Sequence, residues 1–223
     1  MSRAKRVTPA KCLFHVLNRA NGNFKLFESE RCYRQFLAIF EEARRRHQTQ
    51  LLAYCLMPNH WHMLLSPQVD GDLSPFVKRF SFRAARRWHY NHGTIGRGHL
   101  YQGRFRSFVI VDDAHLITVC RYIEANPLRA GLVVRAEDWK WSSAGAHMSA
   151  SEGGSPRARG ALRLDALPVS LPADWRAFVN APTSATETEG IRDAIRGERA
   201  ARLRPRADED GDQAEPMLAA DDG

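Results

Sequence analysis

Four short segments rich in apolar residues are each predicted to be a β-strand; the second and third are apolar runs, and the fourth alternates basic with apolar residues. The four segments are residues 11–17, 51–57, 60–66 and 104–111. Only a Pro-Asn turn separates the second segment from the third, so these two should pair as an antiparallel hairpin.

Apolar residues recur every three or four positions in three further segments, which predicts amphipathic helices. The first opens at Glu28–Glu30, where Ser29 is a suitable N-cap. The second covers about residues 74–90, and the third begins after Asp112–Asp113. The third helix should end near Asn126–Pro127, because a residue that precedes proline is disfavoured in the helical conformation.

The resulting order of elements is strand, helix, strand, strand, helix, strand, followed by one more helix. This order predicts an α+β protein with a ferredoxin-like (RRM-like) antiparallel sheet and helices packed on one face. Residues 1–148 are expected to form this domain. The composition then shifts, so residues 149–206 are interpreted as a linker and a small, partly helical appendage around Trp175 and Phe178. Residues 207–223 are acidic and are expected to be disordered.

Charge is distributed unevenly along the 223 residues. Residues 1–148 contain 23 Lys and Arg against 11 Asp and Glu, a net charge of +12, whereas residues 149–223 contain 10 against 14, a net charge of −4. A basic domain with an acidic end is typical of proteins that meet nucleic acid, although a solvated basic surface without a partner has the same composition. No run of 18 apolar residues and no apolar signal segment occurs, so we expect a cytoplasmic protein without a membrane span.

The predicted hairpin carries two histidines one residue apart. Side chains alternate across a strand, so His60 and His62 share one face while Trp61 points to the other. Two imidazoles so placed can bind one metal ion together with a third group, although a bare His-x-His is more often a surface or structural pair.

The third predicted helix offers the missing groups. Tyr122 and Asn126 are four residues apart, so they project from the same helix face. The Asn126 carbonyl could complete a metal site, and the Tyr122 phenol could attack an electrophile held there. The alternative is that Tyr122 is a half-buried core residue, since aromatic side chains on helices usually pack.

Four motifs in this chain resemble those of the REP-associated tyrosine transposases, which are relatives of the IS200-like single-tyrosine transposases of the HUH endonuclease superfamily. They are Tyr54–His62 (YCLMPNHWH), Gln102–Phe105 (QGRF), Cys120–Gly131 (CRYIEANPLRAG) and Trp139–Ser143 (WKWSS). The resemblance covers about residues 11–147, with the motifs in the family's order.

The resemblance implies a definite chemistry. His60 and His62 would bind a divalent metal with Asn126 as the third ligand, and Tyr122 would be the nucleophile. The tyrosine would cleave single-stranded DNA through a covalent 5′-phosphotyrosine, which a later 3′-hydroxyl reverses. Mg²⁺ or Mn²⁺ is the expected metal, with Mn²⁺ better suited to imidazole; zinc is possible but less favoured.

The resemblance also implies a substrate, namely repeated palindromic sequences that fold into DNA hairpins. Five arginines in the second helix and the fourth strand are candidates for phosphate contacts: Arg83, Arg86, Arg87, Arg104 and Arg106. A merely solvated cationic helix face is the alternative for the first three. Two other functions remain open, a DNA-hairpin-binding protein without catalysis and an RNA-binding module on the same fold. The protein is expected to be nucleoid-associated and a monomer or homodimer.

Overall fold

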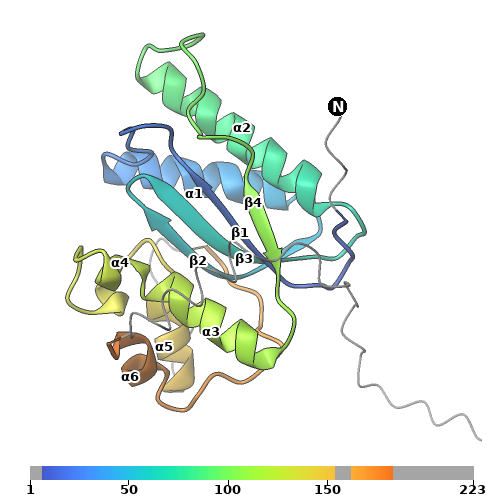
Figure 1. The fold of residues 1–223 in the computed structure, drawn as a ribbon, viewed down its shortest axis with the longest axis vertical. Coiled ribbons are helices and arrows are strands. Elements are labelled where there is room, and N and C mark those ends of the chain that lie inside the picture. Colours follow the sequence, from blue (N-terminus) through green and yellow to red (C-terminus); the bar gives the residue numbers. More distant parts are fainter. Residues whose placement is uncertain (1–6, 154–161, 183–223) are drawn as a thin grey trace, which may run out of the picture.

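A single four-stranded antiparallel sheet organises the protein (Figure 1). The computed structural model describes residues 7–153 and 162–182 of the chain. The strand order is β2-β3-β1-β4, and the strands are β1 Phe14–Arg19, β2 Thr49–Met57, β3 His60–Pro67 and β4 Arg106–Val109. The predicted α+β, ferredoxin-like class is confirmed.

Helices α1 (Glu30–Arg44) and α2 (Leu73–Asn91) cover one face of the sheet. Their aromatic side chains interlock with those of the sheet: the Phe80 ring lies 5.3 Å from both Phe40 and Trp61, measured between ring centroids. This aromatic packing buries large apolar area in specific edge-to-face contacts, so it is a main source of stability for this layer.

The opposite face of the sheet is covered as well, which the prediction of helices on one face did not anticipate (Figure 1). The helices there are α3 Asp113–Glu124, α4 Asn126–Arg129, α5 Ala144–Ser151 and α6 Trp175–Asn180, with a 3₁₀ turn at Ala136–Asp138. The central strands show the physical reason. All but one residue of β2 and of β3 are buried, and strands covered on both faces read as continuous apolar runs.

The outer edge of β2 is protected by chain that follows α4. Leu56 N–H donates to the Trp141 carbonyl at 2.9 Å, and Ser143 N–H donates to the Tyr54 carbonyl at 2.9 Å. Further along the edge, Asp165 N–H donates to the Leu51 carbonyl at 2.8 Å. These bonds satisfy backbone groups that an open edge strand would offer to another chain.

Two predicted strands differ in extent from the structure. The first strand begins at Phe14 instead of residue 11, where Lys11 has a left-handed φ of 61° that ends regular pairing. The fourth strand is shorter than residues 104–111. Ser29 occupies the N-cap of α1, but its hydroxyl makes no capping hydrogen bond. No helix within the described residues has the length and apolar character needed to cross a bilayer.

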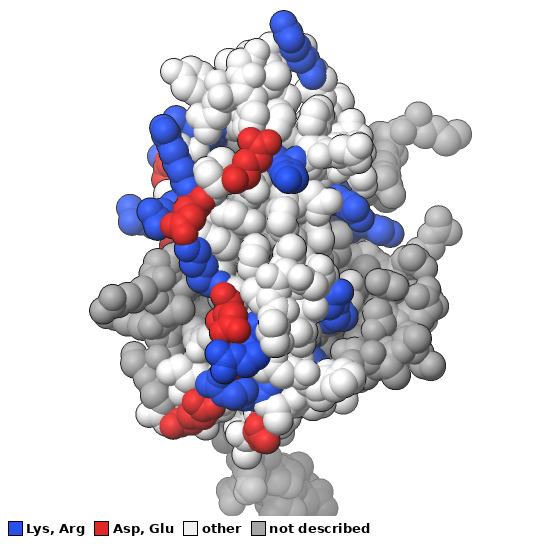
Figure 2. Space-filling view, turned by 90° about the vertical axis from the view of Figure 1, so that its left-hand side faces the viewer, with Lys and Arg blue, Asp and Glu red and all other residues white. Residues whose placement is uncertain are grey.

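Charges of both signs lie close together on the face drawn in Figure 2. The structure contains several ion pairs of this kind, including Lys140 with Glu30, and Arg176 with Glu137 and Glu152. The net positive charge of residues 1–148 is therefore not spread evenly over the surface.

Candidate active site

The two histidines of β3 lie on the face of the sheet that α3 covers. The structure confirms that Trp61, between them, points into the opposite core. The His62 ring is 4% exposed and the His60 ring is partly exposed, and their centroids are 5.1 Å apart. One imidazole is thus sealed in the protein while its neighbour reaches the surface.

Register places two arginines on the same face as these histidines. His60 pairs with Arg19 on β1, and His62 pairs with Leu17, which in turn pairs with Arg106 on β4. Residues directly opposite in an antiparallel pair share a face, so Arg19 and Arg106 lie beside the histidines. Both arginines are exposed. This end of the sheet face is therefore open and basic.

Tyr122 and Asn126 both meet this histidine pair. The Tyr122 ring stands edge-on to the His62 ring, with centroids 5.7 Å apart. Helix α3 ends at Glu124, and Asn126 is the first residue of the separate helix α4, with Pro127 in its first turn. The Asn126 side chain nevertheless reaches His60, whose pKa it raises. The spacing of four residues thus brings both groups to the site, although the helix predicted to carry them is interrupted.

The donor set fits a divalent metal with three protein ligands. His60 Nδ1 lies 2.8 Å from Asn59 Oδ1, and His62 Nδ1 lies 2.9 Å from His15 Nε2. Metal-binding histidines commonly donate one ring N–H to such a partner and keep the other nitrogen for the metal. No group of three His, Cys, Asp or Glu side chains suits a metal anywhere in residues 7–153 and 162–182. The Asn126 amide, which reaches His60, is the candidate for a third ligand.

The histidines at this site are held neutral. Burial lowers the pKa of His60 to about 4, with a further lowering from the Arg19 charge and an opposing effect of the Asn126 hydrogen bond. Burial also lowers the pKa of His62 well below its ordinary value, and the neighbouring His15 adds to this effect. Neutral imidazole is the form that binds metal ions.

Two residues of the site were not predicted. His15, on β1, contacts His62 as described above, and Arg129 contacts Tyr122. Arg129 Cζ lies 4.3 Å from the Tyr122 ring centroid, and Arg129 Nη2 donates to the Tyr122 carbonyl at 2.7 Å. Arg129 lies within the motif Cys120–Gly131, so its seven-residue separation from Tyr122 was a usable signal. His15 could be assigned to the site only once it was known that β1 pairs with β3.

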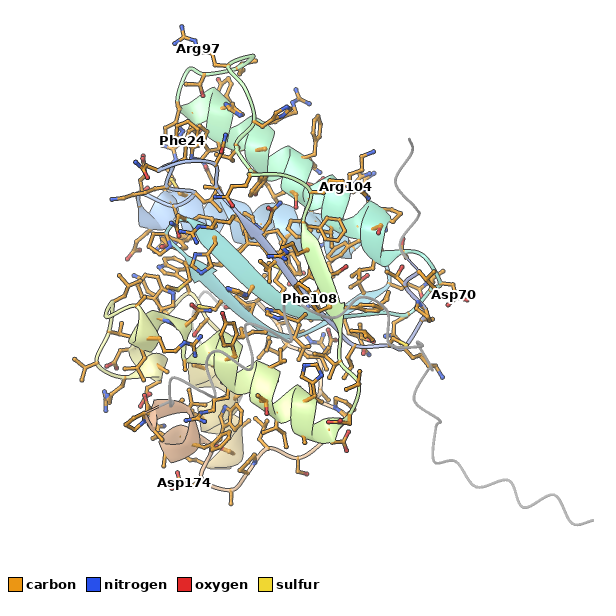
Figure 3. All side chains as sticks on the ribbon, viewed as in Figure 1. Phe24, Asp70, Arg97, Arg104, Phe108 and Asp174 are labelled. Atoms are coloured by element: carbon orange, nitrogen blue, oxygen red, sulfur yellow. The ribbon has the colours of Figure 1, made fainter. Side chains whose placement is uncertain are left out.

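The arginines expected to bind DNA fall into two groups. Arg83, Arg86 and Arg87 lie on α2, across the sheet from Tyr122, and Arg83 forms an ion pair with Glu42. Arg106 lies on the histidine face, and Arg104 is exposed in the loop just before β4 (Figure 3).

A buried carboxylate anchors the helix that carries Tyr122. Glu124 is 0% exposed and accepts hydrogen bonds from three side chains: Ser143 Oγ at 2.5 Å, His147 Nδ1 at 2.6 Å and Trp175 Nε1 at 2.8 Å. The last two donors belong to α5 and α6. The end of α3 is thus fixed to the outer helical layer close to Tyr122.

The fold and this site define a class: ferredoxin-like proteins with a histidine pair on a central strand and a tyrosine on the helix that packs over it. The family model of the IS200-like transposases matches residues 8–126, more than half of the chain. The chain belongs to that family.

The known proteins to which this chain is similar include the following two. A curated protein of Haemophilus influenzae, described as a REP-associated tyrosine transposase, is 25% identical over 118 residues, which are 49% of this chain and 66% of that protein. A solved structure of a REP-associated tyrosine transposase bound to a REP hairpin has a TM-score of 0.54 and 22% identity, and the match covers 69% of this chain and 87% of that one. The second likeness establishes the fold.

Proposed function

We propose that this protein is a metal-dependent single-stranded DNA endonuclease and strand transferase that acts at palindromic DNA hairpins. The observation that carries the proposal is the edge-on contact between the rings of Tyr122 and His62, 5.7 Å between centroids, on an open basic face of the sheet. A tyrosine needs no metal-ligating neighbours in order to pack. Its position over a neutral histidine pair would put the phenol beside a phosphate bound by a metal ion at that pair.

His60, His62 and the Asn126 amide would hold Mg²⁺ or Mn²⁺. A divalent ion there supplies Lewis-acid polarisation of the scissile phosphate. All three ligands are neutral, so the charge of the ion is not cancelled by its ligands.

Tyr122 is the proposed nucleophile. Its oxygen forms a bond to phosphorus, the bond from phosphorus to the 3′-oxygen breaks, and the phenol proton is lost while the released 3′-oxygen gains one. The product is a 5′-phosphotyrosine and a free 3′-hydroxyl. Attack by another 3′-hydroxyl reverses the exchange, so strand transfer requires no nucleotide hydrolysis.

The arginines proposed to contact DNA form two sets, one on each face of the sheet. Arg106, in the same cross-strand row as His62, would contact the strand that contains the scissile phosphate. Arg86 and Arg87 are exposed on α2, on the other side of the sheet, and would contact phosphates away from the point of cleavage. Substitution of Arg106 by Ala should slow cleavage of bound DNA. Substitution of Arg86 and Arg87 should weaken binding and reduce its salt dependence without slowing that step.

Covalent trapping tests the proposal. The protein is incubated with Mn²⁺ and a 5′- or 3′-labelled single-stranded hairpin taken from repeated palindromes beside its gene, and adducts are resolved under denaturing conditions. Wild type should form an adduct with the strand 3′ of the cut, Tyr122→Phe should form none while still binding the hairpin, and a chelator should abolish the reaction. Tyr90→Phe is the matched control, because Tyr90 is 68% exposed near the end of α2, on the other side of the sheet from the histidines. An adduct in Tyr122→Phe, or cleavage unaffected by chelator, would contradict the mechanism. A wild-type protein that binds but never cleaves would be a hairpin-binding protein instead.

A further inference from the structure

A third histidine lies behind the pair on β3. His15, on β1, is 1% exposed, and its Nε2 lies 2.9 Å from His62 Nδ1. The two rings are 5.1 Å apart between centroids and inclined by 26°. The centroids of the Phe108 and Tyr122 rings lie 6.3 and 6.1 Å from that of His15, and Phe108 comes from β4 (Figure 3).

One proton lies between His15 Nε2 and His62 Nδ1, bound to one of these two nitrogens. At 2.9 Å one of the two nitrogens must donate and the other must accept, because two N–H groups or two lone pairs would repel each other. Each neutral imidazole has one N–H and one acceptor nitrogen. Either His15 donates to His62, which puts the second proton on His62 Nε2, or His62 donates to His15, which leaves His62 Nε2 as a lone pair.

The neighbouring histidine shows which arrangement suits the site. His60 Nδ1 faces Asn59 Oδ1, and a carbonyl oxygen can only accept, so His60 holds its proton on Nδ1 and its lone pair on Nε2. If His62 donates to His15, both histidines of β3 have the same tautomer. Both then present Nε2 lone pairs on the same face of the sheet, where they can bind one metal ion.

The identity of residue 15 supports a polar role. Among the described residues, His15 Nδ1 is buried without a hydrogen-bond partner. An unpaired buried polar atom destabilises the fold, and a leucine would fill this position without that cost. The histidine therefore has a use beyond packing.

We propose that His15 is a positioning residue of the metal site: it accepts a hydrogen bond from His62 Nδ1–H and thereby fixes the ring and tautomer of His62 with Nε2 directed toward the metal. His15 itself binds no metal, because its Nε2 is engaged by His62. The inference rests on the proposed function, since it assigns His62 as a ligand.

Two substitutions of His15 separate hydrogen bonding from packing. His15→Gln retains an acceptor oxygen, whereas His15→Leu fills the space without one. Phe108→Leu is the control, because it disturbs packing next to His15 and leaves the hydrogen bond in place. Each variant is first checked for cooperative unfolding and for hairpin binding.

The first readout needs neither metal nor DNA. Long-range ¹H–¹⁵N correlation spectra of the metal-free protein should show the His62 proton on Nδ1 in wild type, in His15→Gln and in Phe108→Leu, and a change of tautomer in His15→Leu. A His62 proton on Nε2 in the wild-type protein would overturn the proposal without recourse to any variant.

The second readout is Mn²⁺ affinity, measured by electron paramagnetic resonance of free Mn²⁺ in the absence of DNA. His15→Leu should bind about 10- to 100-fold more weakly than wild type, the usual effect of losing such a partner, while His15→Gln and Phe108→Leu remain within a few-fold. If His15→Leu binds Mn²⁺ as well as wild type does, this inference fails and the proposed function stands. If wild type binds no Mn²⁺, both fail.

Discussion

Substitution of Glu124 by Ala should destabilise the protein more than any other single carboxylate substitution. The Glu124 carboxylate is completely buried and is the common acceptor for Ser143, His147 and Trp175. Burial alone would lower the pKa of His147, but the charge and hydrogen bond of Glu124 raise it above its ordinary value. The carboxylate therefore favours the charged form of His147 as well as pairing two other donors.

The magnitude follows from what the substitution leaves behind. Each buried donor without its acceptor costs about 1–3 kcal/mol, and removal of one member of a buried ion pair costs about 3–5 kcal/mol. These effects overlap at one carboxylate, so we expect Glu124→Ala to lower the free energy of unfolding by about 3–5 kcal/mol in all. A domain of this kind has only about 5–15 kcal/mol in total. Glu124→Gln retains one acceptor oxygen but no charge, and its loss should be about 1–3 kcal/mol.

Guanidinium denaturation at pH 7, followed by tryptophan fluorescence and far-UV circular dichroism, measures the effect. The matched control is Glu152→Gln, because the Glu152 carboxylate is exposed and pairs with Arg176 at the surface. That control should leave the transition unchanged. A loss below about 1 kcal/mol for Glu124→Ala would refute the reasoning, since it would mean that the three donors find other partners at no cost.

Three further predictions concern other parts of the molecule. Arg129→Met should slow adduct formation by on the order of 100-fold with little effect on hairpin affinity, because the Tyr122 ring loses the guanidinium that packs on it. Single-turnover kinetics measure this rate, and an unchanged rate would contradict the prediction. The free energy of unfolding of the metal-free protein should fall as the pH drops below 6.5, because the unfolded chain protonates histidines that burial keeps neutral in the folded protein. His15 should account for about 2 kcal/mol of this loss by pH 5, and His15→Leu should remove that contribution. Truncation to residues 1–148, the predicted domain, should lower the free energy of unfolding by about 3–5 kcal/mol because Trp175 is lost from the core, and equal stability would support the predicted boundary.

The strands and long helices could be predicted because each has a periodic apolar pattern of its own. The layer formed by α5 and α6 could not, because these helices are short and their burial depends on distant partners. Trp175 is buried against Glu124, 51 residues earlier in the chain, and no local pattern reports such a contact. The apolar run of β3, read as one strand of a hairpin, contained the signal: a strand buried on both faces needs a second layer.

The candidate site was predicted where spacing alone brings residues together. His60 and His62 share a strand face, and Tyr122 and Asn126 both reach them despite the break between α3 and α4. His15 was missed because it meets His62 only through the pairing of β1 with β3, 47 residues apart.

The pattern of charged residues also predicts the DNA-binding surface only in part. The arginines of α2 show which side of that helix faces solvent, but a helical pattern does not tell on which side of the sheet the helix packs.

The position of Tyr122 depends on chain beyond the part that matches the family model. That match ends at residue 126, two residues after Glu124, whereas all three donors to the Glu124 carboxylate lie further on, at Ser143, His147 and Trp175. A buried carboxylate without donors would pull the end of α3 toward solvent and would carry the Tyr122 ring away from His62. The nucleophile and the histidines of the proposed site therefore come from residues 8–126, while the geometry between them is maintained by the later segment. A relative that keeps a carboxylate at this position must supply its own donors, from whatever sequence follows its tyrosine helix.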